Sequence, residues 1–243
     1  RYLPAAQKIS RLAVGIQGPA SGINVVTVPV DFTQENHVEG LPLGTRGGTL
    51  VRYTFPLDGK YEIRVRLMRN RNENVEGLSE PHDMELTLDG ERLEVFTIVP
   101  NRNASGGYYA DEAVDRDLRI SIPVKAGPHA IGATFLRKTS ALQETERQPY
   151  DAHFNMDRHP RIQPAVYSVS IGGPFEASGA GDTPSRKRIF VCRPANKDAS
   201  TEDRCATTIL SSLARRAYRR AVTNEDLRVP LKFYKDARAD GDF

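Results

Sequence analysis

The alternation of apolar and polar residues between positions 24 and 175 constrains the fold of this chain most. Residues 61–67 alternate at every position, residues 84–88 repeat the pattern, and the turn signals Asp58-Gly59 and Asp89-Gly90 stand beside them. Similar short runs follow at 118–122, 130–136 and 166–171. Many short half-buried strands without a long helix between them are typical of antiparallel sandwiches. We therefore expect a mainly β protein, a jelly-roll β-sandwich flanked by short N-terminal and C-terminal α-helical segments.

Helical periodicity replaces the strand pattern on both sides of this central part. In residues 5–14 apolar residues recur at spacings of three and four, and a glycine ends the run. After a polar linker at 179–186, residues 201–203 can cap one helix and residues 223–226 a second, in which Pro230 predicts a kink or a late helix start. The expected domains are a helical tail of a preceding domain at 1–22, a carbohydrate-binding-like β-sandwich at 23–176 and a helical domain at 177–243.

Composition and charge exclude several classes of protein. Of the 243 residues, 39% are hydrophobic and 27% charged, and the formal net charge is +3. These values indicate neither a disordered chain nor the strong positive charge of a nucleic-acid-binding protein. We interpret the cluster of Arg215, Arg216, Arg219 and Arg220 as a helix face that is exposed to solvent or docks against another domain. No run approaches the roughly 20 apolar residues that a membrane-spanning helix needs. We expect no nucleic acid partner and no membrane span.

The segment 40–48, GLPLGTRGG, contains four glycines and precedes a strand. Glycine-rich loops that bind phosphate are followed by a helix and not by a strand, so segment 40–48 is not such a loop. The glycines would let the backbone approach another surface, either a sugar or a neighbouring domain. Thr45 and Arg46 are the side chains that could make directional polar contacts there.

Three long loops, at 70–83, 101–117 and 138–164, interrupt the strand pattern. Long loops on a rigid sandwich are where binding usually resides. Their tyrosines could stack on a sugar ring or cover the core. The candidate ligand-binding residues are Thr45, Arg46, His82, Tyr108 and Tyr109.

The same loops carry acidic residues that could supply oxygen ligands to calcium. The candidate metal ligands are Asp83, Asp111, Asp115 and Asp117, and the alternative is a solvated acidic loop. The five histidines lack the spacing of a metalloprotease, and no GxSxG motif occurs. We therefore assign no catalytic residue.

Cys192 and Cys205 are the two cysteines of the chain. Their separation suits a disulfide that closes a short loop, which would imply an oxidising compartment, while two unrelated buried thiols are the alternative. Neither cysteine belongs to a CxxCH motif, so we expect no haem in this chain.

The C-terminal zone resembles a known family. Residues 183–194, Cys205-Ala206 and residues 213–220 resemble the short helical domain of unknown function in large planctomycete-type multidomain proteins with c-type cytochrome domains. The beginning of the chain, at 2–6 and 12–15, looks like the end of another domain of those proteins, and segment 40–48 is typical of them. The resemblance implies that any electron transfer takes place outside this chain.

The central zone is also similar to carbohydrate-binding modules of the calcium-dependent xylan-binding type. The similar segments are residues 58–66, 86–90 and 124–131, which are strands and turns. This resemblance implies a noncatalytic β-sandwich that holds a xylan-like polysaccharide with calcium as cofactor.

Together these observations predict a noncatalytic polysaccharide-binding module of a larger extracytoplasmic, cytochrome-containing protein, in the periplasm or outside the cell. Its partners would be a polysaccharide and neighbouring domains of the parent protein. One alternative is a structural inter-domain scaffold, and a second is a sugar-active enzyme domain with a deep pocket and perturbed carboxylates.

Overall fold

The computed structural model describes residues 2–15, 22–71, 73–100, 114–138, 161–196 and 198–241. The chain divides into two compact units, one formed by Arg1–Gly18 together with Ala180–Phe243 and the other by Pro19–Gly179. The boundary after residue 179 lies three residues beyond the one that the sequence suggested. We call the first the helical unit and the second the sandwich.

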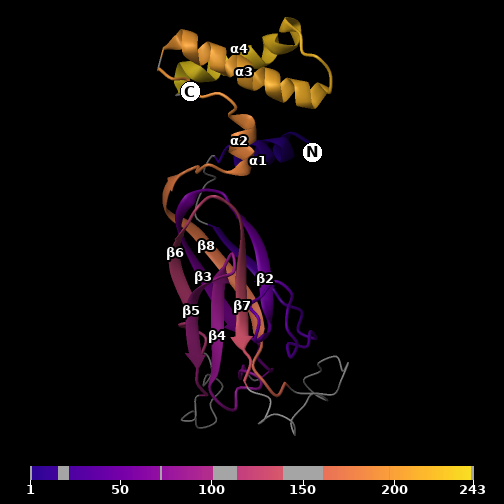
Figure 1. The fold of residues 1–243 in the computed structure, drawn as a ribbon, viewed down its shortest axis with the longest axis vertical. Coiled ribbons are helices and arrows are strands. Elements are labelled where there is room, and N and C mark those ends of the chain that lie inside the picture. The colour runs from indigo at the N-terminus through magenta and orange to yellow at the C-terminus, as the bar shows by residue number, and fades with distance from the viewer. Residues whose placement is uncertain are drawn as a thin grey trace. The chain divides into compact units, whose positions relative to one another are not determined.

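The sandwich contains two antiparallel four-stranded sheets (Figure 1). Its strands are β1 (Gly22–Thr27), β2 (Thr45–Phe55), β3 (Asp58–Leu67), β4 (His82–Leu88), β5 (Glu91–Ile98), β6 (Arg119–Val124), β7 (Gly127–Leu136) and β8 (Val166–Gly179). One sheet has the order β1-β8-β3-β6 and the other β2-β7-β4-β5. This order is that of an eight-stranded jelly roll, so the predicted fold class is confirmed.

Alternation along each strand fills the space between the sheets. On β3, the inward residues Tyr61, Ile63, Val65 and Leu67 are at most 1% exposed, and they pack with apolar residues of the facing sheet. The predicted turn at 89–90 joins β4 to β5, and both of its residues have positive φ. The turn expected at Asp58-Gly59 is wrong, because both residues belong to β3. There the Asp58 carboxylate accepts hydrogen bonds from the Ala126 amide (2.7 Å) and Lys125 Nζ (3.0 Å), which fixes the turn between β6 and β7.

The helical unit contains α1 (Tyr2–Val14), α2 (Pro184–Ile189), α3 (Ala199–Tyr218) and α4 (Asn224–Asp240). Asp198 caps α3 by accepting from the Thr201 amide, so the cap lies three residues before the expected one. Thr223 and Asp226 form a capping box that starts α4, and Pro230 therefore lies inside the helix. The late start at Pro230 is wrong, because the capping box satisfies the first-turn amides six residues earlier.

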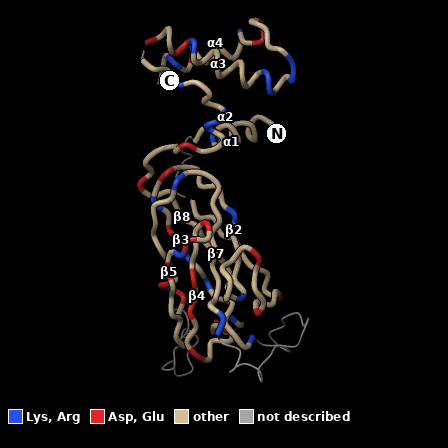
Figure 2. Tube along the Cα trace, viewed as in Figure 1, with Lys and Arg blue, Asp and Glu red and all other residues tan. Residues whose placement is uncertain are grey.

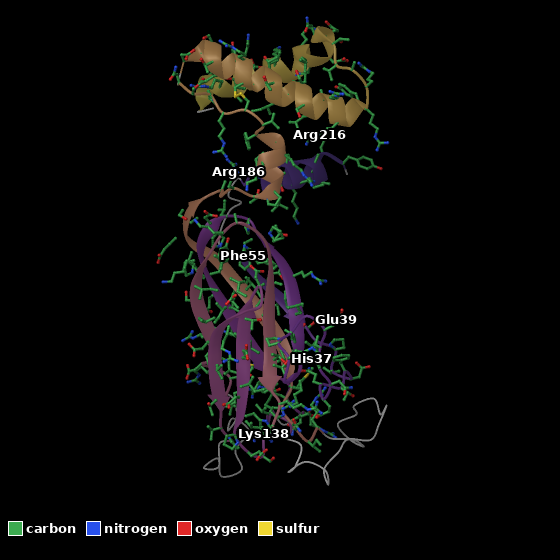
Figure 3. All side chains as sticks on the ribbon, in the orientation of Figure 1. His37, Glu39, Phe55, Lys138, Arg186 and Arg216 are labelled. Atoms are coloured by element: carbon green, nitrogen blue, oxygen red, sulfur yellow. A yellow bond between two sulfur atoms is a disulfide. The ribbon has the colours of Figure 1, made fainter. Side chains whose placement is uncertain are left out.

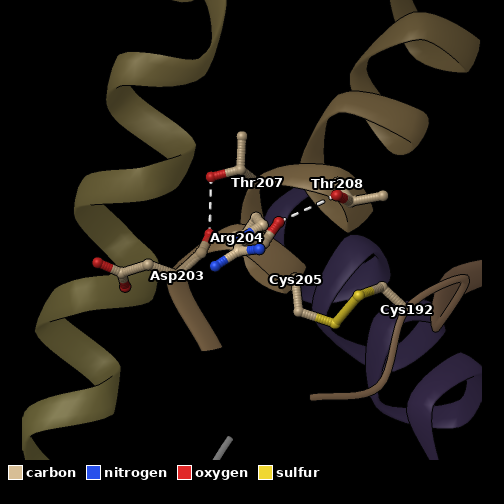
Figure 4. Close-up of a disulfide and its surroundings, with 6 residues drawn as sticks. All are labelled: Cys192, Asp203, Arg204, Cys205, Thr207 and Thr208. Atoms are coloured by element: carbon tan, nitrogen blue, oxygen red, sulfur yellow. Dashed lines mark hydrogen bonds between the residues drawn. A yellow bond between two sulfur atoms is a disulfide. The ribbon is translucent and has the colours of Figure 1, made fainter. Parts of the chain in front are cut away.

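The disulfide between Cys192 and Cys205 joins the segment after α2 to α3, with a Cα–Cα distance of 5.4 Å (Figure 4). Next to it, the hydroxyls of Thr207 and Thr208 donate to backbone carbonyls one turn earlier. The expected pairing is thus confirmed. In the described ranges, no helix is both long and apolar enough to cross a membrane.

Candidate functional site

The two ends of the sandwich differ in how their strands are joined. At one end, two-residue turns at 56–57, 89–90 and 125–126 connect successive strands. The strand ends that are joined by the four long connections, at 28–44, 68–81, 99–118 and 137–165, all lie at the other end. We call this the loop end; Figure 3 labels Lys138 there and Phe55 at the opposite end. Because long connections on a rigid scaffold carry most binding sites, the loop end is the candidate site.

The glycines of segment 40–48 shape a bulge in β2 at this end. The register of β2 against β7 shifts between Arg46 and Thr49, and Gly47 and Gly48 both have positive φ. A Cβ atom on Gly48 would lie 1.9 Å from the Ala133 carbonyl oxygen, and one on Gly47 would lie 2.5 Å from the Gln34 carbonyl oxygen. The surface that these two glycines approach is therefore the sandwich itself, and not a sugar or a neighbouring domain.

Gln34 ties the two sheets together at this bulge. Its amide oxygen accepts from the backbone amides of Gly48 and Val166, at 2.9 Å each, and its amide nitrogen donates to the Val166 carbonyl at 2.7 Å. Gly48 belongs to β2 and Val166 to β8, so one side chain that is 1% exposed bridges strands of opposite sheets. The bonding anchors the β1–β2 connection, to which Gln34 belongs.

Two buried arginines hold the same connection. Arg46 Nη1 donates to the carbonyls of Gln34 (3.4 Å) and Pro164 (3.1 Å), and its guanidinium lies 4.8 Å from the centre of the Phe135 ring. Arg161 Nη2 donates to the carbonyls of Val30 and Phe32, at 2.9 Å each. Both arginines are at most 5% exposed. Together with Gln34 they form what we call the arginine clamp.

Burial perturbs the charged groups around the arginine clamp. It lowers the pKa of Arg46 to about 10, although Glu35 opposes the shift, and it raises the pKa of Glu35. Burial likewise raises the pKa of Glu76, whose carboxylate lies 3.5 Å from Arg161 Nε. Burial and the nearby cations of Arg46 and Lys138 lower the pKa of His82 to about 4, so that His82 is neutral at pH 7.

Three of the ligand-binding residues expected from the sequence fall in the described ranges, and these lie at the loop end but point inward. Thr45, Arg46 and His82 are 2–3% exposed. The hydroxyl of Thr45 donates to the Pro42 carbonyl at 2.7 Å, and His82 packs against the Phe135 ring. Tyr108 and Tyr109 lie outside the described residues.

The expected calcium ligands are used in different ways. Asp115 is buried, accepts from the Leu67 amide and pairs with Arg69 at 2.9 Å. Asp83 accepts from Thr97 Oγ1 at 2.7 Å, and Asp117 is exposed. Asp111 lies outside the described residues. Within the described part of the chain, no three His, Cys, Asp or Glu side chains form a group that could hold a metal ion.

The structure adds Phe32, which the sequence did not single out. Its amide donates to the Pro29 carbonyl at 3.1 Å and its carbonyl accepts from Arg161, so both of its backbone groups are fixed. Its side chain is nevertheless 49% exposed, and the side chain of Val30 is 61% exposed. Residues 28–44 show no regular period, so the sequence did not distinguish Phe32 from a core phenylalanine.

Comparison with known proteins gives no family for the chain. No family model and no curated protein sequence matches it. A family 35 carbohydrate-binding module from Clostridium thermocellum aligns at 13% identity and a TM-score of 0.28 over 62% of this chain and 90% of the module. A family 35 module from an environmental isolate aligns at 11% identity and a TM-score of 0.30 over 68% of this chain and 95% of that module. A family GH115 4-O-methyl-α-glucuronidase with specificity for decorated arabinogalactans aligns at 13% identity and a TM-score of 0.30. This alignment covers 55% of this chain and only 14% of the enzyme.

Proposed function

We propose that the sandwich is a noncatalytic polysaccharide-binding module whose site is the loop end. The observation that carries this proposal is that the arginine clamp fixes the backbone on both sides of an exposed aromatic ring, Phe32. The apolar face of a sugar ring packs well on an aromatic side chain. A ring on a fixed backbone loses little conformational entropy when a ligand binds, which favours affinity.

The arginine clamp also explains the perturbed carboxylates, which resemble those of an enzyme. Perturbed carboxylates in a cleft are typical of catalytic acids and bases. Glu35 and Glu76 are perturbed by burial, but Arg46 acts on the first and Arg161 on both. Because these two arginines hold the β1–β2 connection, the carboxylates balance the charge of a structural cluster. A role in holding the connection accounts for them without catalysis.

The proposal also includes a calcium cofactor, a location outside the cytoplasm and a cytochrome-containing parent protein. Calcium as cofactor is supported by the resemblance of the strand segments to calcium-dependent modules. A periplasmic or extracellular location is supported by the disulfide, because disulfides persist in oxidising compartments. A cytochrome-containing parent protein is supported by the resemblance of the helical segments.

Affinity electrophoresis of the full chain tests the proposal. Gels would contain xylan, other plant and algal polysaccharides or no polysaccharide, each with calcium or with a chelator. We expect retention on at least one polysaccharide, and we expect Phe32→Ala to abolish it. Phe175→Ala is the matched control, because Phe175 is 44% exposed on β8, towards the opposite end of the sandwich.

Two results would overturn the proposal. One is that no polysaccharide retards the chain with or without calcium. The other is that Phe32→Ala and Phe175→Ala reduce retention equally, which would place binding away from the loop end. Circular dichroism of both variants would show that they remain folded.

A further inference from the structure

A hollow of about 570 Å³ lies in the helical unit where α3 ends and the connection to α4 begins. It is lined by Ser211, Arg215, Arg219, Arg220, Ala221 and Val222. Its volume lies in the range of pockets that bind small ligands or a few side chains of a partner. Half of its lining residues are arginines, and the polysaccharide site proposed above does not involve them.

The arginines of this hollow differ in how their charges are balanced. Arg220 is held by Asp226 through two hydrogen bonds of 2.7 and 2.8 Å, and it lies over the Tyr218 ring. The side chains of Arg215 and Arg219 have no hydrogen bond or ion pair with any residue in the described ranges, and both are exposed. The hollow therefore presents two uncompensated guanidinium groups.

The surroundings add to this positive charge. Residues 180–243 contain 14 Lys and Arg against nine Asp and Glu. Figure 2 shows blue segments where α3 meets its connection to α4. Arg219 is the left-handed C-cap residue of α3 and not part of the helix, but Arg215 and Arg219 line the same hollow, where their like charges repel each other. The negative end of the α3 dipole favours cations both at Arg215, in the last turn, and at the C-cap residue Arg219, and so offsets part of this repulsion. An anion in the hollow would relieve the repulsion.

We infer that this hollow binds an acidic segment of a partner polypeptide. The planar fork of a guanidinium group matches a carboxylate with two parallel hydrogen bonds. Ala221 and Val222 provide apolar surface for the aliphatic part of a Glu or Asp side chain. No aromatic ring lines the hollow to stack on a sugar. Two free guanidinium groups are too few for a nucleic acid, which is bound through many phosphate contacts.

Fluorescence anisotropy with a labelled octaglutamate peptide and the full chain tests this inference. The test variant is Arg215→Gln/Arg219→Gln. The matched control is Arg204→Gln/Lys232→Gln, which removes the same charge from exposed positions of α3 and α4 that do not line the hollow. Two lost ion pairs at an accessible site predict an affinity about tenfold lower for the test variant and little change for the control.

Specificity is measured with competitors of similar charge, a short DNA duplex and polygalacturonate. Octaglutamate should bind more tightly than either, and its binding should weaken as salt concentration rises. The inference is overturned if octaglutamate does not bind at low salt, if both double variants lose affinity equally, or if DNA or polygalacturonate binds more tightly. Because the readout does not involve the loop end, it is independent of the outcome for polysaccharide binding.

Discussion

Replacing Gln34 with methionine tests whether one amide holds the two sheets together at the loop end. Methionine has nearly the same length and volume, so the change leaves the packing filled and removes the polar bonds. Three hydrogen bonds disappear, and the amides of Gly48 and Val166 and the Val166 carbonyl lose their partner. Gly48 and Val166 are both buried, so water does not take over the hydrogen bonds that the Gln34 side chain made.

The expected loss follows from these three bonds. Each contributes about 1 kcal/mol net, and a buried group left without a partner costs about 1 to 3 kcal/mol. Gln34→Met should therefore lower the free energy of unfolding of the sandwich by about 3 to 9 kcal/mol. The matched control is Gln163→Met, because Gln163 is similarly buried, at 8% exposed, and its side chain forms no hydrogen bond with the described residues. We expect a loss below about 1 kcal/mol there.

Residue-by-residue amide hydrogen exchange is the appropriate assay, since it reports on the sandwich separately from the helical unit. Protection should fall for core amides of both sheets in Gln34→Met, and most strongly for Gly48 and Val166. The reasoning is refuted if Gln34→Met loses no more stability than Gln163→Met, because the bridge would then contribute nothing beyond its packing.

Three further predictions concern a histidine, a glycine and the disulfide. Burial lowers the pKa of His82 to about 4, so the unfolded chain binds a proton at higher pH than the folded one, and stability should fall by up to about 3 kcal/mol between pH 6.5 and 4. Urea unfolding across this range should show a smaller decrease in His82→Phe, and equal slopes would contradict the assignment. Gly48→Ala should cost at least about 2 kcal/mol more than Gly44→Ala in thermal unfolding, because both glycines have positive φ but only the first would bring its Cβ against a β7 carbonyl. Reduction of the Cys192–Cys205 disulfide should lower the stability of the helical unit by about 3 kcal/mol, and unchanged amide protection in α3 would argue against this.

The period of two was sufficient to predict the jelly roll. Each sheet needs one buried face, and residues 61–67 and 84–88 show in sequence which face that is. The cap at Thr223 could also be read, because its bonds are local. The start of α3 was placed wrongly, since both Asp198 and Thr201 are residues that cap helices well.

The arginine clamp could not be predicted in the same way. Gln34 meets Gly48 and Val166, which are 14 and 132 positions away, and no local pattern records such a contact. Arg46 was singled out as the polar side chain of a glycine-rich segment, but its depth inside the sandwich depends on the bulge in β2. The sequence therefore identified the segment but not the direction in which its side chain points.

The helical unit is built from two segments of the chain, one that precedes the sandwich in the sequence and one that follows it. Within it, Arg186 donates to the Val14 carbonyl, and a Cβ atom on Gly15 would lie 2.6 Å from the Cβ of Ala180. The chain therefore leaves the helical unit and returns to it at neighbouring points. This is the arrangement of an inserted domain. Because the two ends of such a domain lie close together, it can be exchanged without disturbing the domain into which it is inserted. Residues 19–179 could thus be replaced by a short linker, or by a jelly roll with other loops, while the helices keep their own contacts.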